Sequence, residues 1–295
     1  MSQAGEEKAS LHRPGAWVVR TVEGMRWFPT SLTWELPDGR TARWSSRAAR
    51  RRGRIEVSDA SGASSVVSAE PVTAARLDRI NTVAAVSFMI GGSLFSLGAL
   101  FAQLDVGTPH SIDVTYLVGG FFFSLGGYTS VLQAVNTPVH LGEDGSLRSE
   151  RWRWWARMPR NLGWLSAVVL FVGTLLFAVS LVAAFADGLT VRESNTWIWV
   201  PDMLGCVCFL VSGHLAWLEV CHGRMGIRIH ELGWWCVFAN QVGSWLFFLA
   251  GLAAYVRPAT SLSVNEGLAN WGTFLGAACF VAGGVLQAFE RPSRG

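Results

Sequence analysis

The sequence has little charge for its length. Asp, Glu, Lys and Arg make up only 15% of the 295 residues, whereas apolar residues make up 51%; an ordinary globular chain has roughly 25% charged residues. The charge is also uneven, because residues 1–79 hold 13 of the 24 Lys and Arg residues and several later stretches hold none. This composition excludes an ordinary soluble protein and predicts a membrane domain joined to a small basic segment.

Features that would identify a secreted protein or a known class of enzyme are also missing. The first residues carry charge and no apolar core, so they do not form a secretory signal peptide. There is no Walker loop, no HExxH and no zinc-ligand spacing, and the five cysteines lie in or beside apolar stretches, as buried thiols do. We therefore expect a non-enzymatic protein with no catalytic residue, no metal and no cofactor.

Six apolar segments are long enough to cross a bilayer, since a hydrocarbon core of about 30 Å needs about 20 helical residues. They lie at about residues 80–104, 114–136, 162–186, 200–220, 232–256 and 268–290. The predicted fold class is therefore an all-α membrane protein with six transmembrane helices in residues 79–291, preceded by a small cytoplasmic β-containing module in residues 1–78. This topology places 22 of the 24 Lys and Arg residues inside, which predicts cytoplasmic N- and C-termini and a plasma-membrane location.

The six segments share an internal pattern. In each, a Gly is followed four residues later by a Phe, as at Gly91 and Phe95, and Leu-Gly-Trp at 162–164 recurs at 232–234, an offset of 70 residues. Glycine lets neighbouring membrane helices approach closely, and the Phe one turn away fills the adjacent space. The pattern predicts three repeated helical hairpins.

The C-terminal half also resembles a known family. A Trp-rich lead-in before Asn-Gln-Val-Gly-Ser at 240–244, followed by Asn-Trp-Gly-Thr-Phe-Leu-Gly at 270–276, resembles the YrhK-type membrane domain of bacteria. The segment at 200–210 is similar to longer actinobacterial members with repeated hairpins. The resemblance covers residues 160–290, and 80–136 more weakly. It implies a bacterial inner membrane, but it brings no activity and no catalytic residue.

The N-terminal module is predicted to contain β-hairpins. Apolar residues alternate over 31–46 around a Pro-Asp-Gly turn, and a second hairpin is predicted from 54–57 to 66–67. The spacing of Val18, Val22 and Met25 predicts a short amphipathic helix over 16–28. So small a module is expected to lean on the membrane helices or on a protein partner.

A basic cluster lies between the two hairpins, at Arg47, Arg50, Arg51, Arg52 and Arg54. Anionic lipid headgroups attract such residues by about 1 kcal/mol each, so contact with the cytoplasmic membrane surface is predicted. A solvated basic face is an alternative. We expect no nucleic acid partner, because no aromatic-interleaved RNA-binding signature accompanies the cluster.

Three polar residues take equivalent positions at the cytoplasmic ends of the second, fourth and sixth spans: Gln133, Glu219 and Glu290. If the hairpins surround a pseudo-threefold axis, these residues form a ring that attracts cations at a pore mouth. The alternative is that each helix end reaches the headgroups, where Glu is solvated.

A second candidate site consists of polar residues inside the spans, at His214, Asn240, Gln241 and Ser244. Polar groups are costly in a bilayer and are therefore functional candidates, although hydrogen bonds between helices also explain them. His214 is also a candidate ligand for haem or a metal, or a proton relay.

Three functions remain open from these features. The first is a protein that passes or senses a small solute or ion, with His214, Asn240, Gln241 and Glu219 converging on one site. The second is a membrane anchor that presents residues 1–78 to a protein partner, and the third is a haem or quinone redox component. Permeation predicts a hydrated cavity at the polar positions, whereas anchoring predicts a dry, tightly packed core.

Overall fold

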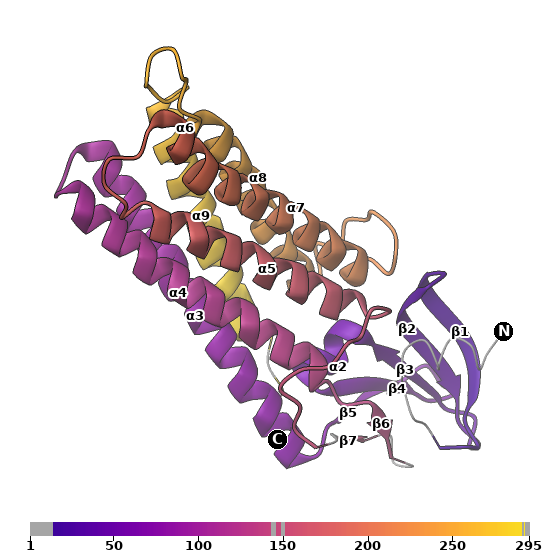
Figure 1. The fold of residues 1–295 in the computed structure, drawn as a ribbon. Helices are drawn as coiled ribbons and strands as arrows, with labels where there is room; N and C mark the ends of the chain where they lie inside the picture. Colours follow the sequence, from indigo (N-terminus) through magenta and orange to yellow (C-terminus); the bar gives the residue numbers. More distant parts are fainter. Residues whose placement is uncertain (1–13, 143–145, 149–150, 291, 293–295) are drawn as a thin grey trace.

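A computed structural model describes residues 14–142, 146–148, 151–290 and 292. It is a bundle of six long helices with a small β module at one end, which we call the module end (Figure 1). The predicted fold class is confirmed. Residues 1–13 of the predicted module and Arg291 and Arg294 of the predicted cytoplasmic C-terminus lie outside the described residues.

The six long helices follow the predicted spans, and all are long and apolar enough to cross a membrane. They are α3 (Pro71–Leu104), α4 (Pro109–Val135), α5 (Leu162–Ala183), α7 (Val200–Val220), α8 (Leu232–Ala254) and α9 (Glu266–Phe289). Large apolar side chains are exposed on the outside of the bundle, among them Phe121, Val182 and Leu204. Such a surface is stable against lipid and not against water. The chain is therefore a multi-pass membrane protein.

The fourth span is longer than predicted. Helical structure already begins at α6 (Val191–Ser194) and continues through a π-helical turn, η1 (Asn195–Trp199), so the span runs from Val191 to Val220. The N–H of Val200 reaches back to the carbonyl of Asn195, the spacing of a π turn, directly before Pro201. Proline has no N–H and crowds the preceding turn, which explains the local widening of the helix.

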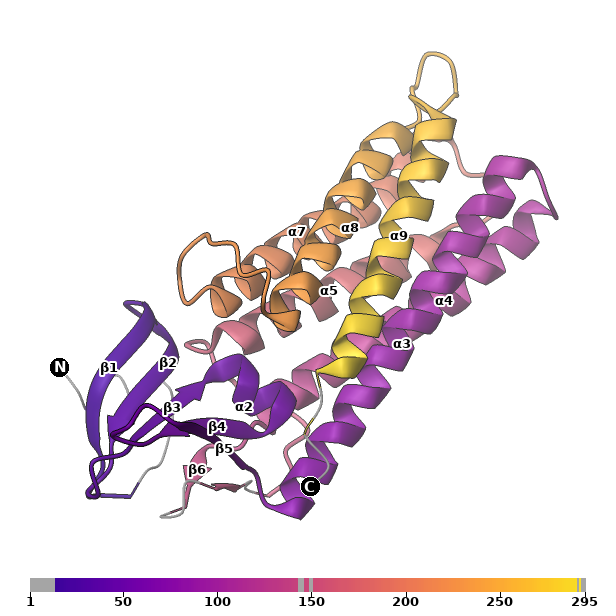
Figure 2. The same ribbon diagram turned by 180° about the vertical axis from the view of Figure 1, so that it is seen from behind.

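The helices close into a ring of three hairpins. Within the hairpins α3 packs on α4, α5 on α7, and α8 on α9; between hairpins α4 packs on α5, α7 on α8, and α9 returns to α3 (Figure 2). Each hairpin is closed by the same reciprocal contact, in which a glycine of either helix lies against a phenylalanine of the other. The pairs are Gly91 with Phe123 and Gly119 with Phe95, Gly173 with Phe209 and Gly205 with Phe177, and Gly243 with Phe280 and Gly276 with Phe247.

The module is a five-stranded antiparallel sheet in which consecutive strands are neighbours. Its strands are β1 (Val18–Met25), β2 (Phe28–Glu35), β3 (Thr41–Ser45), β4 (Arg54–Ser58) and β5 (Ser64–Ser68). Both predicted hairpins are confirmed, as β2–β3 and β4–β5. The helix predicted over 16–28 is wrong: this segment is β1, which pairs with β2. Val18 and Val22 are 59% and 45% exposed, so no core holds the apolar face that a helix would need, and β-branched residues favour a strand.

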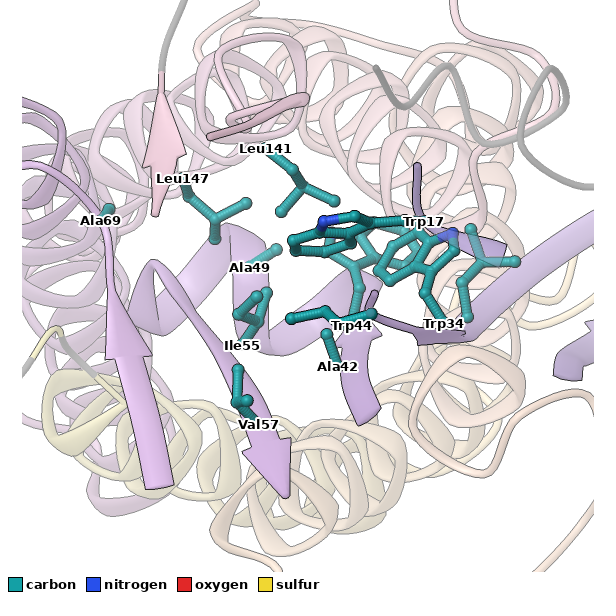
Figure 3. Close-up of a cluster of buried hydrophobic side chains, with 12 residues drawn as sticks. Trp17, Trp34, Ala42, Trp44, Ala49, Ile55, Val57, Ala69, Leu141 and Leu147 are labelled. Carbon is teal, nitrogen blue, oxygen red and sulfur yellow. The ribbon is translucent and has the colours of Figure 1, made fainter. Parts of the chain in front are cut away.

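The core of the module is completed by a connection of the membrane domain. Trp17, Trp34 and Trp44 pack together on one face of the sheet; Leu141 lies beside these rings, and Leu147 lies on the side of Ala49 and Ile55 (Figure 3). The two leucines come from a short hairpin between α4 and α5, made of β6 (His140–Leu141) and β7 (Leu147–Arg148). The module therefore leans on the membrane domain, as its small size predicts.

The glycine–phenylalanine contact gives a direct test of hairpin packing. A Cβ atom at Gly205 would lie 2.5 Å from the Phe177 ring, so Gly205→Ala is expected to destabilise the protein by about 1–3 kcal/mol through overpacking. The matched control is Gly267→Ala in the first turn of α9, where the nearest atom is 3.7 Å away. Thermal unfolding in detergent measures both variants, and equal melting temperatures would contradict the packing described.

Candidate functional site

A short helix of the module closes the module end of the bundle. Helix α2 (Ser46–Arg52) lies between β3 and β4 and is placed between the sheet and the ends of the long helices (Figure 2). Arg47, Arg50 and Arg51 stand three and four residues apart, so they share the helix face that meets the bundle. Ala49 is fully buried in the module core. All three arginines are buried, with 7–9% of their surface exposed.

Arg50 binds Glu219 of α7. Its Nη2 donates to Glu219 Oε2 at 2.7 Å, and the hydroxyl of Ser46 donates to Glu219 Oε1 at 2.6 Å. Glu219 is 1% exposed, so both carboxylate oxygens are satisfied by α2 and not by water. A buried carboxylate requires such partners to remain charged.

Arg47 forms a two-point ion pair with Glu290, the residue after α9. Its Nε donates to Oε1 at 3.1 Å and its Nη2 to Oε2 at 2.6 Å, the fork geometry that suits guanidinium and carboxylate. Burial alone would raise the pKa of Glu290, but the charge and hydrogen bonds of Arg47 hold that pKa below its ordinary value. The pKa of Arg47 is correspondingly raised by Glu290, against the opposing effect of burial. Both groups are therefore charged.

Arg51 meets amides in place of a carboxylate. Its Nη1 donates to Oδ1 of Asn81 on α3 at 2.7 Å, and the same oxygen accepts from Gln133 at 3.4 Å and Gln287 at 3.3 Å. Burial lowers the pKa of Arg51 to about 10, and the nearby charges of Arg47 and Arg50 act in the same direction. The cluster thus holds three cations against two carboxylates.

The three arginine contacts follow the three hairpins. The first helix of each hairpin contains one residue at an equivalent position: Asn81, Gly163 or Gly233. Each lies ten residues before the glycine of the same helix that packs against a phenylalanine. A Cβ at Gly163 would overlap the Arg50 guanidinium, and one at Gly233 would lie 2.8 Å from Arg47 Nε. Asn81 stands at the corresponding place in the first hairpin and binds Arg51 directly. The glycines of the recurring Leu-Gly-Trp triplet therefore leave room for arginine.

The predicted ring and the predicted basic cluster bind each other. Gln133, Glu219 and Glu290 are 0%, 1% and 2% exposed, so they do not lie solvated among headgroups. The two carboxylates bind α2 directly and Gln133 binds Asn81, which accepts from Arg51; we call this meeting of the helix ends with α2 the mouth. Arg47, Arg50 and Arg51 fill this mouth, which corrects the expectation that they contact the lipid surface. Arg52 and Arg54, at the back of the cluster, are half-buried.

Behind the arginines the bundle contains a small cavity whose wall combines apolar side chains with several polar ones. Its volume is about 90 Å³, and Asn240 and Ser244 of the second predicted site line it. Further polar groups on its wall are Ser130, Gln133, Ser166, Ser212 and Gln287. Ser166 and Ser212 bond to each other across α5 and α7, and Ser244 donates to the carbonyl of Asn240 at 2.8 Å. Both explanations of the intramembrane polar residues, helix packing and contact with a solute, thus fit Asn240 and Ser244.

Six phenylalanines, one from each long helix, fill the middle of the bundle. They are Phe95, Phe123, Phe177, Phe209, Phe247 and Phe280, with ring centroids of neighbouring pairs 5.1–6.5 Å apart. On the far side of this layer a second cavity of about 320 Å³ opens, lined by Asp113, Tyr116, Asp202 and Asn270 among others. The phenylalanine layer therefore separates two cavities, each of which has polar groups on a largely apolar wall.

The other two residues of the predicted intramembrane site lie elsewhere. His214 is exposed on the outer surface of α7, so it does not converge with Asn240 and Glu219. Gln241 lies between α7 and α8 against Gly213, and its Oε1 is buried without a hydrogen-bond partner in the described part of the chain. At this level of α7 the residues that face the interior are Ser212 and Gly213. The next residue, His214, is therefore turned outward.

Ser46, Asn81 and Gln287 were not recognised as site residues from the sequence. Asn81 and Gln287 were detectable in principle, since each is an uncharged polar residue near the end of a span. Among the described residues, no group of three or more His, Cys, Asp or Glu is placed to hold a metal ion.

Comparison with protein-family models, curated proteins and solved structures finds no match to this chain. The resemblance to YrhK-type domains therefore stays a prediction, and the site must be interpreted from its own geometry.

Breaking the Arg50–Glu219 pair on one side is expected to be costly. Arg50→Met leaves a buried carboxylate without its counter-charge and should lower the free energy of unfolding by about 3–5 kcal/mol, whereas the double variant Arg50→Met/Glu219→Leu should recover most of this loss. The control is Arg40→Met, which removes an exposed pair with Asp38 and should cost about 0–1 kcal/mol. If chemical denaturation shows that Arg50→Met lowers the free energy of unfolding no more than Arg40→Met does, the buried pair does not stabilise the docking of α2 at the mouth.

Acid is expected to weaken the docking of α2. Because the pKa of Glu290 is lowered in the folded protein, its carboxylate stabilises the fold above its ordinary pKa of 4.5, and this contribution is lost as the pH falls from there through the folded value. Melting temperatures measured as a function of pH should fall below pH 4.5, and less steeply in Glu290→Gln. Identical acid profiles for both proteins would show that Glu290 is not charged in the mouth.

Proposed function

We propose that the chain is a bacterial plasma-membrane protein, with cytoplasmic termini, that passes a small cation through its helical ring, and that the structure is its closed state. In this proposal the N-terminal module is the cytoplasmic gate, and α2 is the part that blocks the mouth. The protein is proposed to be non-enzymatic.

The observation that carries the proposal is the position of the three arginines. They come from the module and each meets a different hairpin of the bundle: Arg47 and Arg50 neutralise Glu290 and Glu219, and Arg51 binds Asn81. Buried ion pairs add little stability compared with apolar packing of the same volume, and their best-attested use is to fix a register or to operate a switch. A module that served only as an attachment would bind more stably through apolar contacts.

The rest of the axis supports the same function. With α2 withdrawn, the mouth presents two carboxylates and Gln133, a lining that attracts cations. Asp113 and Asp202 give the far cavity acidic groups as well. The phenylalanine layer between the cavities is an apolar constriction of the kind that gates by dewetting, and in this proposal it becomes hydrated when α2 withdraws.

The dense phenylalanine layer also favours a second function. A dry core is what a membrane anchor requires, and β1, an edge strand of the sheet among the described residues, offers that edge to a partner. In that case the arginines would only hold the module in a defined orientation, and no variant of the mouth would conduct.

Opening the mouth without removing any charge separates the two functions. In Gly163→Ala/Gly233→Ala the new methyl groups occupy the space of the Arg50 and Arg47 guanidinium groups. Monovalent cation flux into proteoliposomes should rise about tenfold or more over the wild type, which corresponds to about 1.4 kcal/mol in the closed–open equilibrium. Gly267→Ala, whose added methyl group makes only an ordinary contact at 3.7 Å, is the control and should behave like the wild type.

A folded double variant with unchanged flux would contradict permeation and leave the anchor as the function. Gel filtration and thermal unfolding establish that the variant is folded before its flux is interpreted.

A further inference from the structure

A separate cavity lies outside the bundle, between the module and the connection from α7 to α8. Its volume is about 450 Å³. One wall is the sheet, and the other is the connection around residues 222–231 with the start of α8. The connection lies beside β1 and β2 (Figure 1), where His222 Nδ1 and Thr30 Oγ1 are 3.0 Å apart.

The sheet supplies this cavity with charge because of the alternation of its strands. In β4, Ile55 and Val57 point into the module core, so Arg54 and Glu56 point to the opposite face. Arg43 of β3 lies on that face too, directly across from Glu56 in the strand register. One face of the sheet is thus a core wall and the other is a wall of the cavity.

The cavity has an excess of positive charge. Five arginines line it against three glutamates, and His222 and His230 add two further imidazoles. Three of the arginines have carboxylate partners: Arg47 with Glu290, Arg43 with Glu23, and Arg228 with Glu231.

Arg52 and Arg54 have no ion pair with any residue that the structure describes. The Nε of Arg54 is buried and has no hydrogen-bond partner in the same part of the chain. Burial and the charge of Arg52 lower the pKa of Arg54, with Glu56 acting in the opposite direction. A buried guanidinium donor without an acceptor is uncommon, because an unmade hydrogen bond to a charged group is costly.

We propose that this cavity binds a phosphate-bearing anion through Arg52 and Arg54. The guanidinium fork matches phosphate oxygens, and the volume falls in the range of about 300–1,000 Å³ typical of small-molecule sites. The phosphate has two possible sources, a soluble phosphate compound and the headgroup of an anionic phospholipid. The chemistry that recognises them is the same.

The cavity is joined to the mouth. Arg47 and Glu290 line it as well as forming the ion pair that holds α2. A bound phosphate would compete with Glu290 for Arg47, so the ligand would regulate the gate; this consequence rests on the proposed function. Binding itself does not, and it is tested without measuring flux.

The test uses the full chain in phosphatidylcholine nanodiscs. Calorimetry with inorganic pyrophosphate probes a soluble source, and native mass spectrometry of protein from nanodiscs doped with phosphatidylglycerol probes a headgroup source. Arg52→Gln and Arg54→Gln are the test variants. Arg40→Gln, an exposed arginine of the same module outside the cavity, is the control.

Binding of either probe that weakens about tenfold or more in Arg52→Gln and Arg54→Gln, and not in Arg40→Gln, supports the site and identifies the source. Two results would overturn it: no binding of either probe to the wild type, or binding that the two cavity variants leave unchanged. Glu56→Gln should strengthen binding, because it removes a carboxylate from the cavity wall without removing a donor.

Discussion

The structure depends on one electrostatic constraint: three buried arginines of a water-facing module need acceptors inside a membrane domain. Glu219 and Glu290 supply charge, and the amide cluster around Asn81 supplies the rest. Each contact fixes α2 relative to a different hairpin, so the module can dock in only one orientation. The two glycines at 163 and 233 are consequences of this constraint, because any side chain there would displace a guanidinium group.

The same constraint connects parts of the chain that are distant in sequence. The module core needs Leu141 and Leu147 from the membrane domain, and the membrane domain needs α2 to satisfy its buried carboxylates. The two units therefore share their stability. Any signal that draws α2 away from the mouth would leave Glu219 and Glu290 without partners, and water or cations would have to replace the arginines.

Features that depend on local pattern were predictable from the sequence. The spans follow from hydropathy, the hairpins from alternation and turn residues, and the contacts of Gly91 and Phe95 from spacing on a membrane helix. The predictions that were wrong concerned features that depend on contacts between residues distant in the sequence. The apolar residues of β1 suit a helix until β2 is beside them, and a run of arginines has the composition of a lipid-binding surface until Glu219 and Glu290 are placed opposite it. The outward orientation of His214 was not predictable, because the sequence indicates how deep the residue lies in the span but not how α7 is rotated about its axis.

The central claim is that α2 seals the mouth, and access to Ser212 tests it most directly. Ser212 is 4% exposed and lines the cavity behind the arginines. In a background without the five native cysteines, Ser212→Cys should be protected from a charged, membrane-impermeant thiol reagent added at the module side. It should become reactive when Gly163→Ala/Gly233→Ala is added. Equal labelling in the two backgrounds, whether full or absent, would contradict a seal made by α2.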